Sequence, residues 1–140
     1  MSRVFWDTNL FIYLFEDYGA LSKAVVQLRS AMLARGDQLL TSALTLGEIL
    51  VKPTERGDTE LCTKYERAIV AAAGIISFDL KAARTYAELR SERSLRAPDA
   101  IQLACAANAG VDLFVTNDER LQGKHVSGIQ FIVALERVPI

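Results

Sequence analysis

Five short apolar runs alternate with segments of helical periodicity along the 140 residues of this chain. Each run is mostly apolar, which is typical of strands that are covered on both faces. Strands separated by helices pair in parallel through right-handed crossovers. The pattern therefore predicts an α/β fold, a three-layer α/β/α sandwich. The predicted strands are Arg3–Asp7, Gln38–Thr41, Gly74–Phe78, Asp112–Thr116 and Gln130–Ala134.

Three of the intervening segments have clear helical signatures. Ala20–Arg35 carries apolar residues at spacings of three and four, and Asp79–Leu95 has one apolar side. Pro98–Ala109 begins with a proline in its first turn and is followed by a glycine. The clearest break is Lys52–Thr59, which is predicted to connect two helices. We find no repeat or linker, so the chain is expected to form a single domain over residues 1–140.

Composition and charge exclude several classes of protein. Hydrophobic residues make up 51% of the chain, which argues against disorder. The net charge of −1 argues against nucleic-acid binding by bulk charge, so any such contact has to come from local basic groups. Two cysteines are too few for a disulfide framework, and Cys105 is expected to be a core thiol.

The sequence carries no sign of export or membrane insertion. Its most apolar stretch, Ala68–Ile76, is far shorter than the roughly 20 residues of a membrane-spanning helix. No secretory signal precedes the first predicted strand. We therefore expect a reducing, cytoplasmic environment and no membrane association.

Four acidic residues stand where predicted strands and helices meet. Asp7 ends the first predicted strand, and Asp118 lies two residues after the fourth. Asp99 lies in the first turn of a helix, where the helix dipole favours a carboxylate, and Glu48 lies one or two turns into another helix. In an open parallel sheet, ligands bind beyond the carboxyl ends of the strands. The four acids are therefore expected to reach one edge of the sheet.

Such a group of carboxylates has a physical problem, because the charges repel and at least one pKa should rise in the absence of metal. Mg²⁺ or Mn²⁺ removes the repulsion, since hard cations prefer oxygen ligands. A bound cation also acidifies water and stabilises a leaving phosphate oxygen. The pattern predicts a metal-dependent enzyme that acts on phosphate esters, and four acids serve one ion or two equally well.

Each acid taken alone also fits a structural role. Asp99 and Asp118 both suit the first turn of a helix, whereas Asp7 is harder to explain in this way because it ends an apolar strand. Most of the 17 acidic residues are expected to be solvated, so only the four together indicate a site. Five other acids are predicted to be loop or cap residues: Asp17, Asp37, Asp58, Asp79 and Asp112.

The four acids stand in four short blocks. These are Asp7-Thr8-Asn9 after Val4-Phe5-Trp6, Thr45-x-x-Glu48, Arg96-Ala97-Pro98-Asp99-Ala100 and Phe114-Val115-Thr116-Asn117-Asp118-x-x-Leu121. In this order, and in a chain of this length, the blocks resemble the PIN-domain family. Within it, the likeness is greatest to the VapC-type toxins of bacterial and archaeal toxin–antitoxin pairs. The segment Pro53–Ala73 carries little of the resemblance.

The resemblance implies a five-stranded parallel sheet and an Mg²⁺- or Mn²⁺-dependent endoribonuclease that leaves a 5′-phosphate and a 3′-hydroxyl on RNA. It also implies a homodimer and a partner antitoxin whose chain blocks the acidic cleft. On the matching positions, the acids Asp7, Glu48, Asp99 and Asp118 would bind the metal and carry catalysis. Thr116 would orient the last acid or a bound water. Asn9 and Asn117 would support the site, or equally cap the helices that follow the strands.

Basic residues and the single histidine complete the candidates. Arg90, Arg93 and Arg96 are spaced three apart and lead toward the third acid, so on one helix they would form a stripe able to hold an RNA backbone. Arg96 is the best candidate for an RNA phosphate contact, whereas Arg90 is assigned to a solvated face. His125 alone does not supply the two imidazoles that metal-free ribonuclease chemistry usually needs.

Two other functions stay open at this point. The first is a catalytically weak PIN-fold module that binds RNA or a protein, which metal binding without cleavage of diverse RNAs would favour. The second is a small-molecule phosphatase, although no Asp-x-Asp pair follows the first predicted strand. Hydrolysis of a generic phosphomonoester would favour it.

Overall fold

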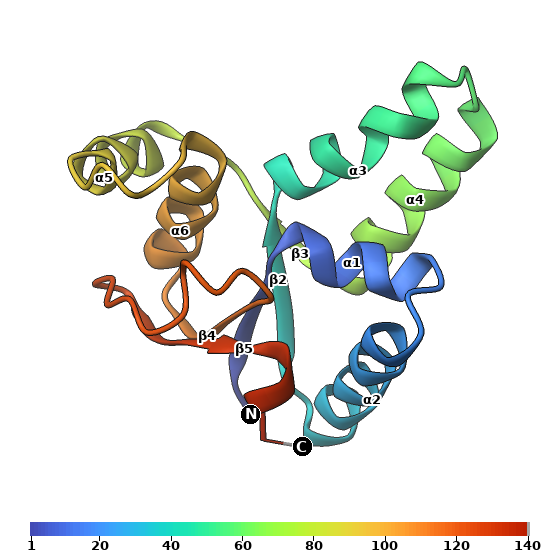
Figure 1. The fold of residues 1–140 in the computed structure, drawn as a ribbon, viewed down its shortest axis with the longest axis horizontal. Helices are drawn as coiled ribbons and strands as arrows, with labels where there is room; N and C mark the ends of the chain where they lie inside the picture. Colours follow the sequence, from blue (N-terminus) through green and yellow to red (C-terminus); the bar gives the residue numbers. More distant parts are fainter. Residues whose placement is uncertain (140) are drawn as a thin grey trace.

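A computed structural model describes residues 1–139 and contains a five-stranded sheet, as predicted (Figure 1). All strand pairs are parallel, and the strand order is β3-β2-β1-β4-β5. Phe5 of the central strand lies opposite Leu40 on one side and Phe114 on the other. The strands are β1 (Arg3–Trp6), β2 (Gln38–Ser42), β3 (Gly74–Ile76), β4 (Val111–Thr116) and β5 (Ile129–Ala134).

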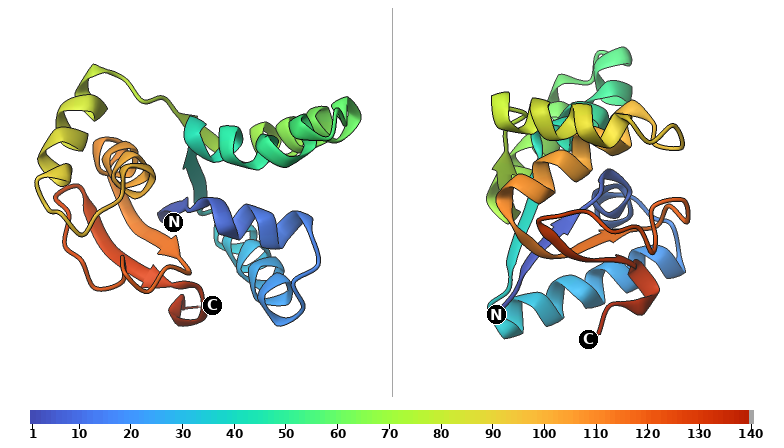
Figure 2. Two further views of the ribbon diagram at one scale, coloured as in Figure 1. Left: turned by 45° about the horizontal axis from the view of Figure 1, so that its top comes forward. Right: turned by 90° about the vertical axis from the view of Figure 1, so that its left-hand side faces the viewer.

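Helices cover both faces of this sheet. Helices α1 and α2 lie on one side and α5 and α6 on the other, while α3 and α4 form a hairpin that projects away from the sheet beside α1 (Figures 1 and 2). The helices are α1 (Thr8–Phe15), α2 (Ala20–Arg35), α3 (Ala43–Glu55), α4 (Thr59–Ala72), α5 (Leu80–Arg90) and α6 (Ala97–Ala109), with a 3₁₀ turn η1 (Leu135–Arg137) near the end. Within residues 1–139, no helix combines the length and apolar character needed to cross a membrane.

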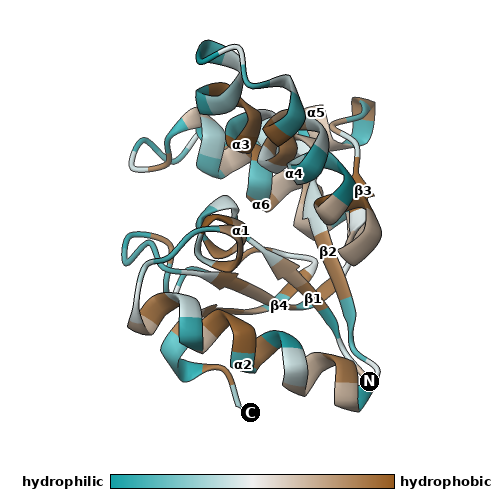
Figure 3. Cartoon of the chain, turned by 90° about the vertical axis from the view of Figure 1, so that its right-hand side faces the viewer, coloured by the Kyte–Doolittle hydropathy of each residue, from teal (hydrophilic) through white to brown (hydrophobic). Residues whose placement is uncertain are grey.

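The two faces of the sheet build two separate hydrophobic cores. Alternate residues of β1 point to opposite faces. Val4 and Trp6 belong to the core under α1 and α2, whereas Phe5 belongs to the core under α5 and α6. Phe5 stacks on Phe114 with ring centroids 5.0 Å apart. Figure 3 shows hydrophobic stretches along β1 and β2 and bands of both colours on α2, as expected for a helix with one buried side. The predicted three-layer sandwich is therefore confirmed.

The prediction for the helix that precedes α6 was wrong at its end. The segment was expected to continue to Leu95, but α5 ends at Arg90 and a turn follows. In this turn the hydroxyl of Ser91 donates a hydrogen bond to the carbonyl oxygen of Glu88, and Leu95 inserts into the core. Arg90, Arg93 and Arg96 therefore do not form a stripe on one helix.

The connection between α3 and α4 also lies later than predicted. Helix α3 continues through Pro53 to Glu55, and the break falls at residues 56–58, where Gly57 has a φ of 67°. Pro53 lies in the last turn of α3, where a proline removes one helical hydrogen bond, and its ring is buried. Glycine adopts this left-handed conformation without a steric cost, so it, and not the proline, ends the helix.

Candidate active site

All four predicted acids line one cavity of about 400 Å³ at the carboxyl end of the sheet. Asp7 directly follows β1, and Asp118 lies two residues after β4. These neighbouring strands flank the position where the strand order reverses, which is where open α/β sheets bind ligands. Asp99 enters from the first turn of α6, and Glu48 from the second turn of α3. The cavity is also lined by Thr8, Asn9, Ile12, Arg96, Pro98, Gln102 and Arg120.

Asp7 is held by hydrogen bonds to both oxygens of its carboxylate. Oδ1 accepts from the backbone N–H of Thr8 at 2.8 Å, which makes Asp7 the N-cap of α1. Oδ2 accepts from the hydroxyl of Thr116 at 2.9 Å. The Thr116 oxygen also accepts from the backbone N–H of Asp118 at 3.0 Å. One buried threonine thus links the side chain of the first acid to the backbone of the last.

The expected rise of a carboxylate pKa occurs at Asp7. Burial is the largest cause, and it raises the pKa of Asp7 to about 6. The carboxylates of Asp99 and Glu48 push in the same direction, while the hydrogen bonds from Thr116 and Thr8 oppose it. Two hydrogen bonds are therefore not enough to compensate the negative charge at this position.

Asp99 and Asp118 share an arginine that the sequence analysis missed. Arg120 donates from Nε to Oδ1 of Asp118 at 3.0 Å and from a terminal nitrogen to Oδ2 at 2.6 Å. The same terminal nitrogen lies 3.8 Å from Oδ2 of Asp99. These bonds lower the pKa of Asp118, whereas burial and the charge of Asp118 raise the pKa of Asp99. The only signal in the sequence is the position of Arg120, two residues after an acid.

A buried hydrogen-bond network lies beneath the acids and was also missed. The hydroxyl of Thr8 donates to Oε1 of Glu48 at 2.6 Å. The side-chain amide of Gln102 donates to the hydroxyls of Thr8 at 3.1 Å and Thr45 at 2.8 Å, and its carbonyl oxygen accepts from Ser42. Gln102 therefore joins α1, β2 and α3 to α6. A signal exists in the sequence, because Gln102 is a polar residue one helical turn after Asp99 in an otherwise apolar run.

Of the other candidate residues, two line the acidic cavity and two do not. Asn9 is exposed and lines the cavity, as does Arg96. The amide of Asn117 donates to the hydroxyl of Tyr13 at 3.3 Å and does not line the cavity. His125 is exposed and is likewise absent from the lining. Cys105 is buried, and this burial raises the pKa of its thiol to about 11, as expected for a core thiol.

Four of the five acids that were predicted to be loop or cap residues fill those roles, whereas Asp112 lies in strand β4. Each accepts a hydrogen bond from a nearby or distant backbone N–H, and two of them cap the helices α4 and α5. None of these five acids lines the acidic cavity. They are Asp17, Asp37, Asp58, Asp79 and Asp112.

The chemistry of the donor set fits a divalent cation, although the side chains are not gathered around one point. Among residues 1–139, no three acidic, histidine or cysteine side chains stand close enough to hold a metal ion. Three of the four predicted acids are instead hydrogen-bonded to other side chains. Asp7 accepts from Thr116, Glu48 from Thr8 and Asp118 from Arg120. Four carboxylates on one cavity are hard oxygen donors. A cation would favour the charged form of Asp7, which burial and, to a smaller extent, the neighbouring carboxylates disfavour.

Comparisons with known proteins agree with this fold. A family model described as the PIN domain matches residues 4–125. A chain of VapBC2 from Rickettsia felis, bound to a promoter DNA fragment, superposes with a TM-score of 0.74 at 17% identity, covering 94% of this chain and 98% of that one. A chain of a Klebsiella pneumoniae toxin–antitoxin complex superposes with a TM-score of 0.66 at 24% identity. The match covers 90% of this chain and 94% of that one. A chain of DNA-bound VapBC from Salmonella typhimurium superposes with a TM-score of 0.72 at 18% identity. The match covers 96% of this chain and 99% of that one. No curated protein sequence matches this chain.

Proposed function

The chain belongs to the PIN-domain family, and on that premise we propose that it is a metal-dependent endoribonuclease, the toxin of a type II toxin–antitoxin pair. One observation carries the proposal. Carboxylates from four separate segments of the chain line one cavity where the strand order of the sheet reverses. Several carboxylates around one cavity repel while they are charged, so a bound cation would stabilise the group.

The residues of the site divide into metal ligands and supports. Asp7, Glu48, Asp99 and Asp118 would hold Mg²⁺ or Mn²⁺. When bound, the cation supplies an acidified water and stabilises charge on the leaving oxygen of the phosphodiester. The hydroxyl of Thr116 orients Asp7, and Thr8 orients Glu48.

Polar and basic residues at the rim would bind the RNA backbone. Asn9 and Arg96 line the same cavity and are exposed, which supports a role in donating hydrogen bonds to phosphate or ribose oxygens. Asn117 would act only indirectly, because its bond to Tyr13 joins the end of β4 to α1 outside the cavity.

A partner antitoxin and a homodimer are part of the same proposal. The similar folds include chains from toxin–antitoxin complexes. A second cavity of about 440 Å³ lies between α1 and the α3–α4 hairpin, with Phe15, Leu61 and Tyr65 among its walls. It shares Ile12 and Glu48 with the acidic cavity, so a chain that lies in it reaches the acids. The mass of the protein in solution, with and without a partner, would test both assemblies.

Cleavage of RNA by the purified, partner-free protein tests the proposal. Single-stranded and structured RNAs would be incubated with Mg²⁺, Mn²⁺ or EDTA. We expect cleavage only with metal, and a loss of at least about 100-fold in Asp7→Asn and Glu48→Gln, because each removes a charged ligand. Glu66→Gln is the matched control, since Glu66 is exposed on α4 outside the cavity. Retained cleavage in both cavity variants would refute the assignment.

A second outcome would point to a different function. Metal binding without cleavage of any single-stranded, structured or cellular RNA would replace the nuclease with a PIN-fold binding module. The contact of Arg120 with Asp99 and Asp118 is the observation that favours such a module, because a guanidinium already neutralises part of the acidic group.

A further inference from the structure

One arginine of the chain reaches into the acidic group. Arg120 forms a two-pronged contact with both oxygens of Asp118, and its guanidinium also lies 3.8 Å from Asp99. Its side chain is 48% exposed, so it comes from the solvent side of the cavity. The positively charged guanidinium of Arg120 therefore lies next to two of the four acids.

We propose that Arg120 is the internal counter-ion of Asp99 and Asp118, that a divalent cation displaces it, and that the released guanidinium then binds a backbone phosphate of RNA. The inference rests on the proposed function, since the cation and the RNA are those of the nuclease.

The contact of Arg120 with Asp118 is incompatible with full use of that carboxylate by a metal ion. Both oxygens of Asp118 accept hydrogen bonds from Arg120, and Oδ1 accepts a second one from its backbone N–H. A cation at this carboxylate would also stand beside a positive guanidinium, and like charges repel. Metal binding therefore competes with Arg120 for Asp118.

The competition costs the fold little, because the turn around Asp118 is held by other contacts. The backbone N–H of Asp118 donates to the hydroxyl of Thr116, and that of Leu121 donates to the carbonyl oxygen of Asp118. Leu121 is buried in the core beside α6. Arg120 can leave Asp118 without releasing this turn, so a purely structural role for its side chain is not needed.

A displaced Arg120 stays at the rim of the cavity, where its chemistry suits a phosphate. Arg96 and Arg120 are the basic residues that line this cavity. With a net charge of −1, the chain has no bulk positive charge to hold RNA, so single residues have to do so. A guanidinium offers five N–H donors in a planar fork that matches the oxygens of a phosphate.

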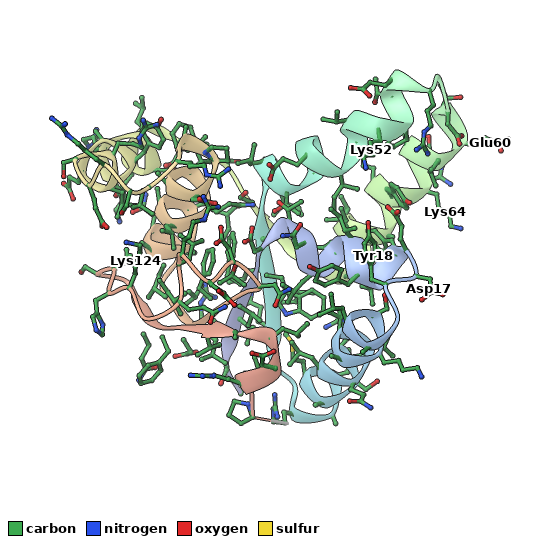
Figure 4. All side chains as sticks on the ribbon, viewed as in Figure 1. Asp17, Tyr18, Lys52, Glu60, Lys64 and Lys124 are labelled. Carbon is green, nitrogen blue, oxygen red and sulfur yellow. The ribbon has the colours of Figure 1, made fainter. Side chains whose placement is uncertain are left out.

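Direct titration with Mn²⁺ tests the competition without any measurement of activity. Calorimetry would compare the wild type with Arg120→Gln, which removes the charge, and with Lys64→Gln. Lys64 lies on the outer surface of α4, and its substitution removes an equal charge far from the cavity (Figure 4). We expect Arg120→Gln to bind Mn²⁺ more tightly, by up to roughly fivefold, the upper limit of what one exposed ion pair contributes, and Lys64→Gln to match the wild type. Equal or weaker binding by Arg120→Gln overturns the proposal, because loss of a supporting contact would weaken the site.

Binding of a fluorescent single-stranded RNA tests the phosphate contact. The fluorescence anisotropy of the RNA would be measured once with EDTA and once with Ca²⁺, which is a hard cation like Mg²⁺. Gels would check that the RNA stays intact. We expect Ca²⁺ to strengthen RNA binding by the wild type and by Lys64→Gln, and Arg120→Gln to lose this gain. An equal gain in Arg120→Gln, or no gain in the wild type, overturns the phosphate contact. A wild type that cleaves no RNA would remove the nuclease, while the Mn²⁺ titration still decides whether Arg120 competes for the acids.

Discussion

Asp7 is at once the N-cap of α1 and an acid whose pKa is strongly raised, and these two features set opposite demands on its charge. A charged carboxylate is the better cap for a helix N-terminus. Burial and the neighbouring carboxylates disfavour that charge and raise the pKa to about 6. In the absence of metal, Asp7 is therefore a source of instability at neutral pH.

The pH dependence of Asp7→Asn follows from that shift. Because the pKa is about 6 in the folded chain, against an ordinary value of 3.8 for an exposed aspartate, the folded chain binds the proton more tightly than the unfolded chain does. The stability that this proton contributes is fully present below pH 3.8 and is lost as the pH rises through about 6. In EDTA, we expect Asp7→Asn to be more stable than the wild type at pH 7.5, by up to about 3 kcal/mol, and the gain to vanish near pH 4.

Urea denaturation at the two pH values measures this difference, with Glu66→Gln as the variant that should show none. An Asp7→Asn protein that is less stable than the wild type at both pH values would contradict the prediction. It would mean that the hydrogen bonds of Asp7 outweigh the cost of its burial.

Gln102 is the residue on which the buried network depends. It is 2% exposed and has three hydroxyl partners, those of Thr8, Thr45 and Ser42. Gln102→Leu keeps a similar volume but removes all three hydrogen bonds. The hydroxyls of Thr8 and Thr45 keep Glu48 and Thr41 as partners, whereas the buried hydroxyl of Ser42 loses its side-chain partner. One unsatisfied buried group costs about 1–3 kcal/mol, so we expect a loss of about that size in the free energy of unfolding.

Chemical denaturation measures that loss, and Gln27→Leu on the exposed side of α2 serves as its control. The loss of the network should also weaken Mn²⁺ binding, because Thr8 then holds Glu48 less firmly. A Gln102→Leu protein of unchanged stability would show that the hydroxyls find other partners.

At the scale of secondary-structure elements, the turn before β5 packs directly on the end of α6. Gly128 has a φ of 99°, and a Cβ atom at this position would lie 2.3 Å from the carbonyl oxygen of Ala107. The backbone carbonyl of Gly128 also accepts from Val111 at the start of β4. The close approach therefore fixes where β4 and β5 sit under α6.

Gly128→Ala should destabilise the protein through both conformation and contact, by roughly 2–4 kcal/mol. Gly123→Ala is the matched control, because Gly123 has a φ of 80° but open space around it. It should cost only about 1 kcal/mol, from the backbone conformation alone. Thermal unfolding of the two variants would compare them, and equal losses would show that the contact with Ala107 adds nothing.

The elements themselves could largely be predicted, because their signals are local. The bounds of α2 were predicted correctly at Ala20–Arg35, since its apolar spacing and the glycines at both ends are visible in the sequence. The end of α5 was not, because Leu95 leaves the helix to fill a core formed by distant residues. A continuous helical pattern does not reveal which of its apolar residues faces which partner.

At the scale of the whole molecule, the meeting of the four acids could be predicted but their hydrogen-bond partners could not. The positions of Asp7 and Asp118 after strands are enough to bring them to one edge of a parallel sheet. The bond from Gln102 to Thr8 joins residues 94 apart in the chain, and that from Thr8 to Glu48 joins residues 40 apart. Such contacts depend on the strand order, which residue spacing does not encode.

The strand order has a consequence for the time at which the site can form. Residues up to 76 build β1, β2 and β3 and supply Asp7 and Glu48, while the rest of the chain supplies Asp99 and Asp118. The two pairs meet only when β4 joins β1, more than 100 residues later in the chain. On the ribosome, the acidic cavity is therefore incomplete until β4 and Asp118 have left the exit tunnel.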